Sequence, residues 1–285
     1  MKPASPTTHV PALPAVGPAT LLRALFKRPQ RPLPATMPEL VTEYRLDSLP
    51  PDDIARYRQA FGFAGVHVPL TWWYLPAQRA HLATMLDPRF PFRIAGLVHM
   101  ENVLEAQGEA LPRQALVLRT VPRMLPASSS GALRCVVETT GTADGAPVFS
   151  CASTYLVRRG QAGGPKRPET QPVPSGPVLG HWTLDAAAGR RYARLSGDWN
   201  PIHLSGWSAR LMGMRRPIIH GMHTLATSCA LLENAGGRRA VRIACRFRAP
   251  VPLGSRVALH TLPGTGEFMV EADGKPAVSG DCGLA

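Results

Sequence analysis

The segment 192-YARLSGDWNPIHLSGWSA-209 places Gly, Asp, Asn, Pro and His within positions 197–203, and 217-PIIHGMHT-224 follows closely. Polar and turn-forming residues at this density predict a loop. Apolar residues flank both segments, so we expect the charged side chains of this loop to lie in a cleft. The question is whether Asp198 and His203 are ordinary loop residues, with Asn200-Pro201 a simple turn, or a pair that moves protons.

The same segment opens the second copy of an internal repeat. The stretch 56-RYRQAFG-62 aligns with 191-RYARLSG-197, and 68-VPLTW-72 aligns with 200-NPIHL-204. Further on, 97-LVHMENVLE-105 aligns with 218-IIHGMHTLA-226, which places His99 over His220. Each half then becomes rich in β-forming residues. A repeat unit of roughly 120–135 residues is far longer than a solenoid repeat, so we expect two copies of one domain.

The expected organisation has four parts. A Pro-rich flexible tail covers residues 1–37, a degenerate first domain 38–159, a Gly- and Pro-rich linker 160–177, and a second, catalytic domain 178–285. In each half we expect a short helix (IARYRQAFG; AAAGRRYARLSG), an apolar helix (GLVHMENVLEAQ; HGMHTLATSCALLENA) and several strands. A long helix packed across an antiparallel sheet makes each half an α+β domain.

Composition excludes several classes of protein. No run approaches the roughly 18–20 apolar residues that a membrane span requires, so we expect no stable membrane insertion. The N-terminus lacks the pattern of a secretory signal. The five cysteines are scattered and form no CxxC pair, which argues against a disulfide framework or zinc ribbon and favours a cytoplasmic location.

The formal net charge of +13 raises the question of an acidic partner. Only four of the 32 basic residues are lysines, a skew that genomic base composition alone can produce. The partners that would use the charge are nucleic acid, an anionic lipid surface, a phosphate-bearing cofactor or an acidic carrier protein. The arginines are dispersed and no nucleic-acid-binding motif is present, so we do not expect nucleic acid.

Four residues offer a connected chemistry. Pro201 disfavours helix for Asn200, so Asp198 and His203 can converge from a loop. A carboxylate and an imidazole sharing one water form a competent general acid/base pair, and Asn200 can orient either the carboxylate or the water. Gly221 stands where an apolar helix begins, and the free N–H groups there suit the developing negative charge of an enolate-like oxygen. Together they fit addition of water across a conjugated thioester, or its removal.

The runs Gly-Asp-x-Asn-Pro-Ile-His and Pro-Ile-x-His-Gly-Met resemble the signature of the MaoC-like, or type 2, enoyl-CoA hydratases, with the strongest match over residues 190–257. The double-length chain is similar to the double-hotdog 3-hydroxyacyl-thioester dehydratases. The resemblance implies a double hotdog fold and reversible hydration of trans-2-enoyl thioesters to (R)-3-hydroxyacyl thioesters. It makes Asp198 and His203 the catalytic pair, Asn200 a supporting substrate-binding residue, and the Gly221 N–H the contact to the thioester carbonyl.

The resemblance also implies that the enzyme needs no metal or redox cofactor, and that coenzyme A or acyl carrier protein carries the acyl group. Arg215, Arg216, Arg246 and Arg248 lie nearest the motifs. The fold is compatible with a homodimer and equally with pairing of the two halves inside one chain. The repeat alignment puts Val66, Val68, Thr71 and Met100 where the second half has Asp198, Asn200, His203 and Gly221. The first half is therefore expected to close the interface and shape the acyl tunnel.

Two alternatives stay open, and a metal site is weighed beside them. A thioesterase of the same fold would direct the water at the thioester carbonyl, although such enzymes generally lack the Asp-x-Asn-Pro-x-His run. A non-catalytic acyl-thioester binding subunit is disfavoured because the second half retains its Asp/His pair. A metal on His220 and His223 lacks a third ligand at helical spacing. We interpret His220 as structural because His99 occupies the matching position of the inactive half.

Overall fold

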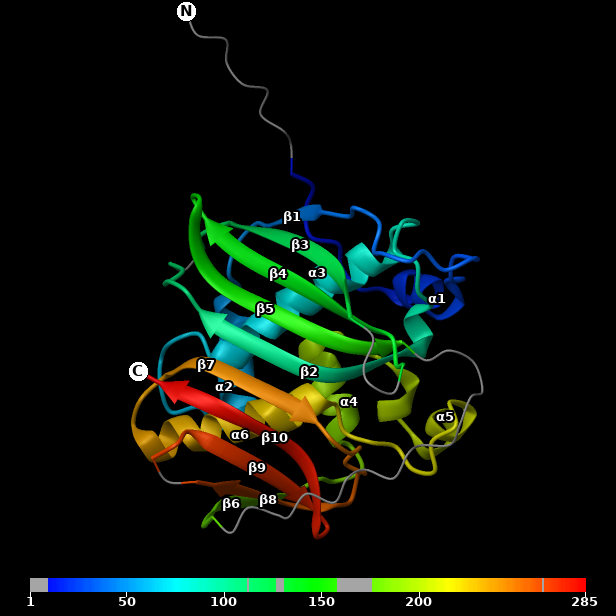
Figure 1. The fold of residues 1–285 in the computed structure, drawn as a ribbon. Coiled ribbons are helices and arrows are strands. Elements are labelled where there is room, and N and C mark those ends of the chain that lie inside the picture. Colours follow the sequence, from blue (N-terminus) through cyan, green and yellow to red (C-terminus); the bar gives the residue numbers. More distant parts are fainter. Residues whose placement is uncertain (1–9, 112, 127–130, 158–175, 263) are drawn as a thin grey trace, which may run out of the picture.

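The computed structural model describes residues 10–111, 113–126, 131–157, 176–262 and 264–285. Their strands form one antiparallel ten-stranded sheet in the order β1-β3-β4-β5-β2-β7-β10-β9-β8-β6 (Figure 1). In the first half the strands are β1 (Thr42–Leu46), β2 (Leu97–Ala106), β3 (Leu116–Leu125), β4 (Arg134–Ala143) and β5 (Ala146–Val157). In the second half they are β6 (Val178–Thr183), β7 (Ala240–Phe247), β8 (Arg256–Thr261), β9 (Glu267–Ala272) and β10 (Lys275–Leu284).

The helices follow the same two-part plan. They are α1 (Pro18–Phe26), α2 (Pro51–Phe61), α3 (Tyr74–Leu86), α4 (Ala188–Ser196), α5 (Gly206–Leu211) and α6 (Gly221–Gly236), with short 3₁₀ turns η1 (Leu70–Trp73), η2 (Ile94–Gly96) and η3 (Pro201–His203). The two long helices, α3 and α6, lie on the same face of the curved sheet (Figure 1). This is the expected double hotdog.

The two halves meet edge to edge through β2 and β7. These strands pair antiparallel from Glu101 opposite Arg246 to Glu105 opposite Arg242. The strand order is the same outward from this junction in each half, so the pairing expected of two hotdog units occurs inside one chain.

The apolar helix of the first half was predicted in the wrong place. Residues 97–106 form β2, which is hydrogen-bonded to β5 on one side and β7 on the other. The apolar residues of this segment fit a helical period as well as a strand period. Hydrogen bonding to a neighbouring strand on each side makes the segment a strand. The long helix of this half is instead α3, whose Pro76 falls in the first turn, where the missing N–H costs nothing.

This shift corrects the repeat alignment. His99 lies in a strand, whereas His220 is the N-cap of α6, so the two histidines are not counterparts, nor are Met100 and Gly221. The first part of the alignment does correspond, because Gly62 and Gly197 both end a short helix in the left-handed conformation, at φ of 76° and 74°. The second apolar helix also ends as predicted, at the left-handed Gly237.

The N-terminal segment differs from a free tail in its described part. Residues 18–26 form α1, and Leu13 is buried in the core with its N–H bonded to the carbonyl oxygen of Arg45. Apolar residues between the prolines give this segment something to bury. Residues 1–9 and 158–175 lie outside the described residues, and the second range holds most of the linker expected at 160–177. Among the helices that are described, none is long and apolar enough to cross a membrane.

Candidate active site

Asp198 is fixed at the turn that follows α4. Gly197 reverses the chain, and the Asp198 N–H donates to Ser196 Oγ at 3.1 Å. One carboxylate oxygen, Oδ1, accepts the N–H of Asn200 at 3.1 Å. The side chain is 28% exposed, so the carboxylate is held by the backbone while part of it stays open to solvent.

His203 ends η3, which Asn200 caps by accepting the Ile202 N–H on its side-chain oxygen at 3.3 Å. The His203 ring lies with Nδ1 2.9 Å from the carbonyl oxygen of Ile218. A carbonyl oxygen only accepts, so Nδ1 carries the proton and the neutral ring keeps its lone pair on Nε2. Burial lowers the pKa of His203, while the Asp198 charge and the Ile218 hydrogen bond act in the opposite direction.

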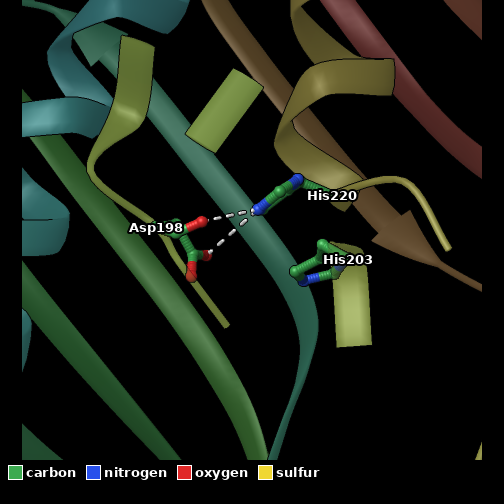
Figure 2. A group of neighbouring side chains, drawn as sticks. All are labelled: Asp198, His203 and His220. Atoms are coloured by element: carbon green, nitrogen blue, oxygen red, sulfur yellow. Dashed lines mark hydrogen bonds and ion pairs between the residues drawn. The ribbon is translucent and has the colours of Figure 1, made fainter. Parts of the chain in front are cut away.

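His220 was interpreted from sequence as a structural residue, but it lies in the site. Its Nε2 lies 3.0 Å from the backbone carbonyl oxygen of Asp198 and 3.9 Å from Asp198 Oδ2 (Figure 2). Its ring stacks on His203 with centroids 3.7 Å apart. Burial, with the nearby His203 second, lowers the pKa of His220 to about 3. The Pro-Ile-x-His-Gly spacing was the available signal, but the mistaken match to His99 masked it.

Asp198, His203 and His220 offer atoms that all lie within 4.8 Å of one another. A water at hydrogen-bond distance from both the Asp198 carboxylate and His203 Nε2 fits this separation. The same three residues are a formal donor set for a metal ion, with His223 outside it. His220 Nε2 already donates to the Asp198 carbonyl, however, so it would have to give up that bond and change tautomer to bind a cation. The arrangement is therefore better suited to holding a water.

Gly221 begins α6, whose first N–H groups have no acceptor within the helix. The glycine also has a packing reason, because a Cβ there would meet the Phe247 ring at 2.6–3.0 Å. The N-terminus of α6 thus approaches the end of β7 closely. His220, the residue before Gly221, ties this helix start to Asp198.

The first half supplies aromatic side chains beside the site. The His99 ring stacks between Tyr74 and Tyr155, at centroid distances of 5.9 and 5.0 Å, and meets Phe247 edge-on at 5.0 Å. Burial lowers the pKa of His99 to about 4. The Asp198 charge acts on this histidine and on both tyrosines, which places the stack within electrostatic reach of the carboxylate.

The four arginines nearest the motifs fall into two groups. Arg246 pairs with Glu101 across the junction of the halves, and Arg248 donates to Ser279 Oγ at 2.7 Å. Arg215 and Arg216 are exposed on the segment between α5 and α6.

Comparison with known proteins agrees with this geometry. A family model described as a MaoC like domain matches residues 169–263. The chain is 29% identical over 219 residues to 3-hydroxyacyl-thioester dehydratase X of Mycobacterium tuberculosis, covering 76% of this chain and 78% of the relative. It is 38% identical over 102 residues to the peroxisomal enoyl-CoA hydratase 2 of Arabidopsis thaliana, covering 34% of this chain and 31% of that protein.

Solved structures extend the likeness to both halves. The crystal structure of HtdX from Mycobacterium tuberculosis superposes with a TM-score of 0.68 and 26% identity, over 84% of this chain and 98% of the other. The first half is thus part of the shared architecture.

Proposed function

Because the chain carries a MaoC-like dehydratase domain within a double hotdog fold, we propose that it is a hydro-lyase of fatty-acid metabolism. It hydrates trans-2-enoyl thioesters to (R)-3-hydroxyacyl thioesters and catalyses the reverse dehydration. The observation that carries the proposal is the placement of an Asp198 carboxylate oxygen within 4.8 Å of a His203 ring nitrogen, in a ring whose Nε2 is left free by the Ile218 bond. The (R) outcome is taken from the family.

The site residues suggest how the reaction proceeds. One water donates hydrogen bonds to the Asp198 carboxylate and to His203 Nε2, and the pair takes up one of its protons as the oxygen bonds to C3. The C2–C3 π electrons move toward the thioester, whose carbonyl oxygen accepts the N–H of Gly221 at the positive end of α6. A proton returned from the pair to C2 completes the addition. Water and proton come from one side, which makes the addition syn.

The other side chains have supporting parts in the proposal. Asn200 acts through its backbone N–H, which holds Asp198, and through its cap on η3. The first half, through the stack of Tyr74, His99 and Tyr155, borders the acyl chain. The reaction needs no metal or redox cofactor. The carrier is coenzyme A or acyl carrier protein, and the exposed Arg215 and Arg216 favour either, because both carriers are anionic.

A substrate assay tests the proposal. Purified protein is mixed with crotonyl-CoA, with longer trans-2-enoyl-CoAs and with the same acyl groups on a carrier protein, while ultraviolet absorbance reports the conjugated double bond and a thiol reagent reports free thiol. Loss of absorbance without thiol release, giving the (R)-3-hydroxy product, is expected. Thiol release would replace hydration with thioester hydrolysis. Tight binding without turnover of any substrate would make the chain a binding subunit.

A further inference from the structure

We propose that His220 is a positioning residue that locks the acid/base pair to the start of α6. The inference deepens the proposed function and rests on it. It stands on two contacts of one ring, a hydrogen bond to the Asp198 carbonyl at 3.0 Å and a stack on His203 at 3.7 Å.

The hydrogen bond connects two segments that must keep their spacing. Asp198 lies in the loop after α4, and His220 directly precedes Gly221 at the N-terminus of α6. Donation from His220 Nε2 to the Asp198 carbonyl therefore fixes the distance between the carboxylate and the N–H groups that face the substrate oxygen. A displacement of about 1 Å between reacting groups costs on the order of 100-fold in rate, so one bond at this point matters.

The surroundings of His220 keep it uncharged. The ring is 3% exposed, and its Nδ1 has no hydrogen-bond partner among the described residues. Protonation would place an N–H group with no acceptor in a buried site. The groups that face the ring are Asp198, His203, His223 and Tyr192, and burial lowers its pKa to about 3. Nε2 therefore keeps its proton and remains a donor at every pH at which the enzyme works.

An uncharged His220 does not oppose proton uptake by His203. During turnover His203 shares the proton taken from water, and a second positive charge at stacking distance would oppose that step. A neutral ring instead supports one face of His203 without competing for the proton. His220 thus holds both members of the pair and transfers no proton itself.

Three variants separate this role from ordinary packing. His220→Gln keeps an amide N–H close to the position of Nε2, whereas His220→Phe keeps an aromatic ring and loses the donor. His223→Phe is the matched control, because His223 is a buried histidine of α6 that packs on Phe61 and Tyr192 and touches neither Asp198 nor His203 in any described contact.

With the enoyl thioester as substrate, we expect His220→Phe to lower kcat by roughly 10–100-fold with little change in KM. His220→Gln should retain most of the activity, and His223→Phe should remain close to wild type. The acid limb of the kcat profile should move to lower pH in His220→Phe, because a released Asp198 loop no longer raises the pKa of His203.

Equal losses in His220→Phe and His223→Phe, or an unmoved acid limb, would overturn the proposal. Nuclear magnetic resonance titration of the His203 ring in the same variants gives a reading that needs no turnover. If wild type hydrates no thioester but the His203 pKa still falls in His220→Phe and not in His223→Phe, the positional coupling stands and the proposed function fails. If His220→Phe does not fold, His220→Gln decides the question. A folded His220→Gln that loses kcat and shifts the His203 pKa would contradict the positioning role of His220.

Discussion

His203 donates Nδ1–H to the carbonyl oxygen of Ile218 across 2.9 Å, and this bond decides that Nε2 is the ring nitrogen with the free lone pair. The acceptor belongs to the strand-like segment that leads directly into His220 and α6. The tautomer of the His203 ring is therefore set by the backbone that also positions the helix start.

Hydration activity should persist below the ordinary histidine pKa. Neutral His203 is the form that accepts a proton, and burial lowers its pKa from the usual 6.5. The hydration rate should therefore hold as the pH falls to 6.5 and decline only as it passes through the lowered value. A kcat profile between pH 5 and 8 checks this, and a midpoint at or above 6.5 would contradict it.

The folded protein should lose stability in mild acid. The pKa values of His81, His99, His220 and His223 are lowered by burial to about 3–4. Below pH 6.5 the unfolded chain binds protons that the folded chain does not, so stability present above 6.5 is lost as pH falls, by up to about 1.4 kcal/mol per pH unit for each group. Urea unfolding at pH 7.5 and 5.5 measures the difference.

His81 supplies the matched variant for that experiment. The side chain is 1% exposed and neither ring nitrogen has a described partner. His81→Leu should therefore reduce the acid sensitivity and raise the free energy of unfolding by about 1 kcal/mol at pH 5.5, because a buried polar group without partners is costly. A variant as acid-sensitive as wild type would show that His81 is hydrated or bonded in solution.

Gly221→Ala should damage activity through Phe247. The added Cβ would meet the ring at 2.6–3.0 Å, so either the ring or the start of α6 must move. We expect kcat to fall by roughly tenfold to 100-fold while the protein stays folded. Adding Phe247→Leu removes the obstructing ring. Recovery of kcat in the double variant would show that Gly221→Ala acts by displacing the helix start and not by removing a contact that only glycine allows.

The two halves should depend on Glu233 for their docking. This buried carboxylate accepts the N–H of Ala240 at 2.9 Å and lies 3.1 Å from Nε2 of His67, on the first half. Glu233→Gln removes one acceptor oxygen from this buried pair and should cost about 1–3 kcal/mol of unfolding free energy. Glu109→Gln, which breaks the exposed pair with Arg239, should cost less than ~1 kcal/mol. Similar losses of unfolding free energy in the two variants would contradict a dependence of the docking on Glu233.

Local sequence was sufficient for helices α4 and α6 of the second half. The turn signals around Asp198 and the glycine stop after α6 are local, and the structure confirms the helices they predicted. The first half depended on pairing between distant segments. Residues 97–106 satisfy two periodicities, and only β5 and β7 on either side select the strand. The edge strands β1 and β6, each paired on one side only, were not anticipated.

The site shows the same division. Asp198, His203 and Gly221 were selected from residue type and spacing, and the structure brings Asp198 and His203 together at the start of the helix that Gly221 opens. Their catalytic roles stay predictions. His220 was interpreted as structural because it aligned with His99, and its contacts with Asp198 and His203 join a loop and a helix start that only the fold brings together. The aromatic stack of Tyr74, His99 and Tyr155 was missed for the same reason, since three separate elements of the other half contribute it.

The most direct measurement compares kcat/KM for enoyl-thioester hydration in wild type, Asp198→Asn, His203→Gln and the double variant, with circular dichroism to confirm folding. Each single change should lower the rate by roughly 10²–10⁴, the range for loss of a general acid/base. Because both side chains act on one water, the double variant should lose about as much as the worse single variant. A folded single variant with wild-type activity, or losses that multiply in the double variant, would contradict a shared acid/base pair.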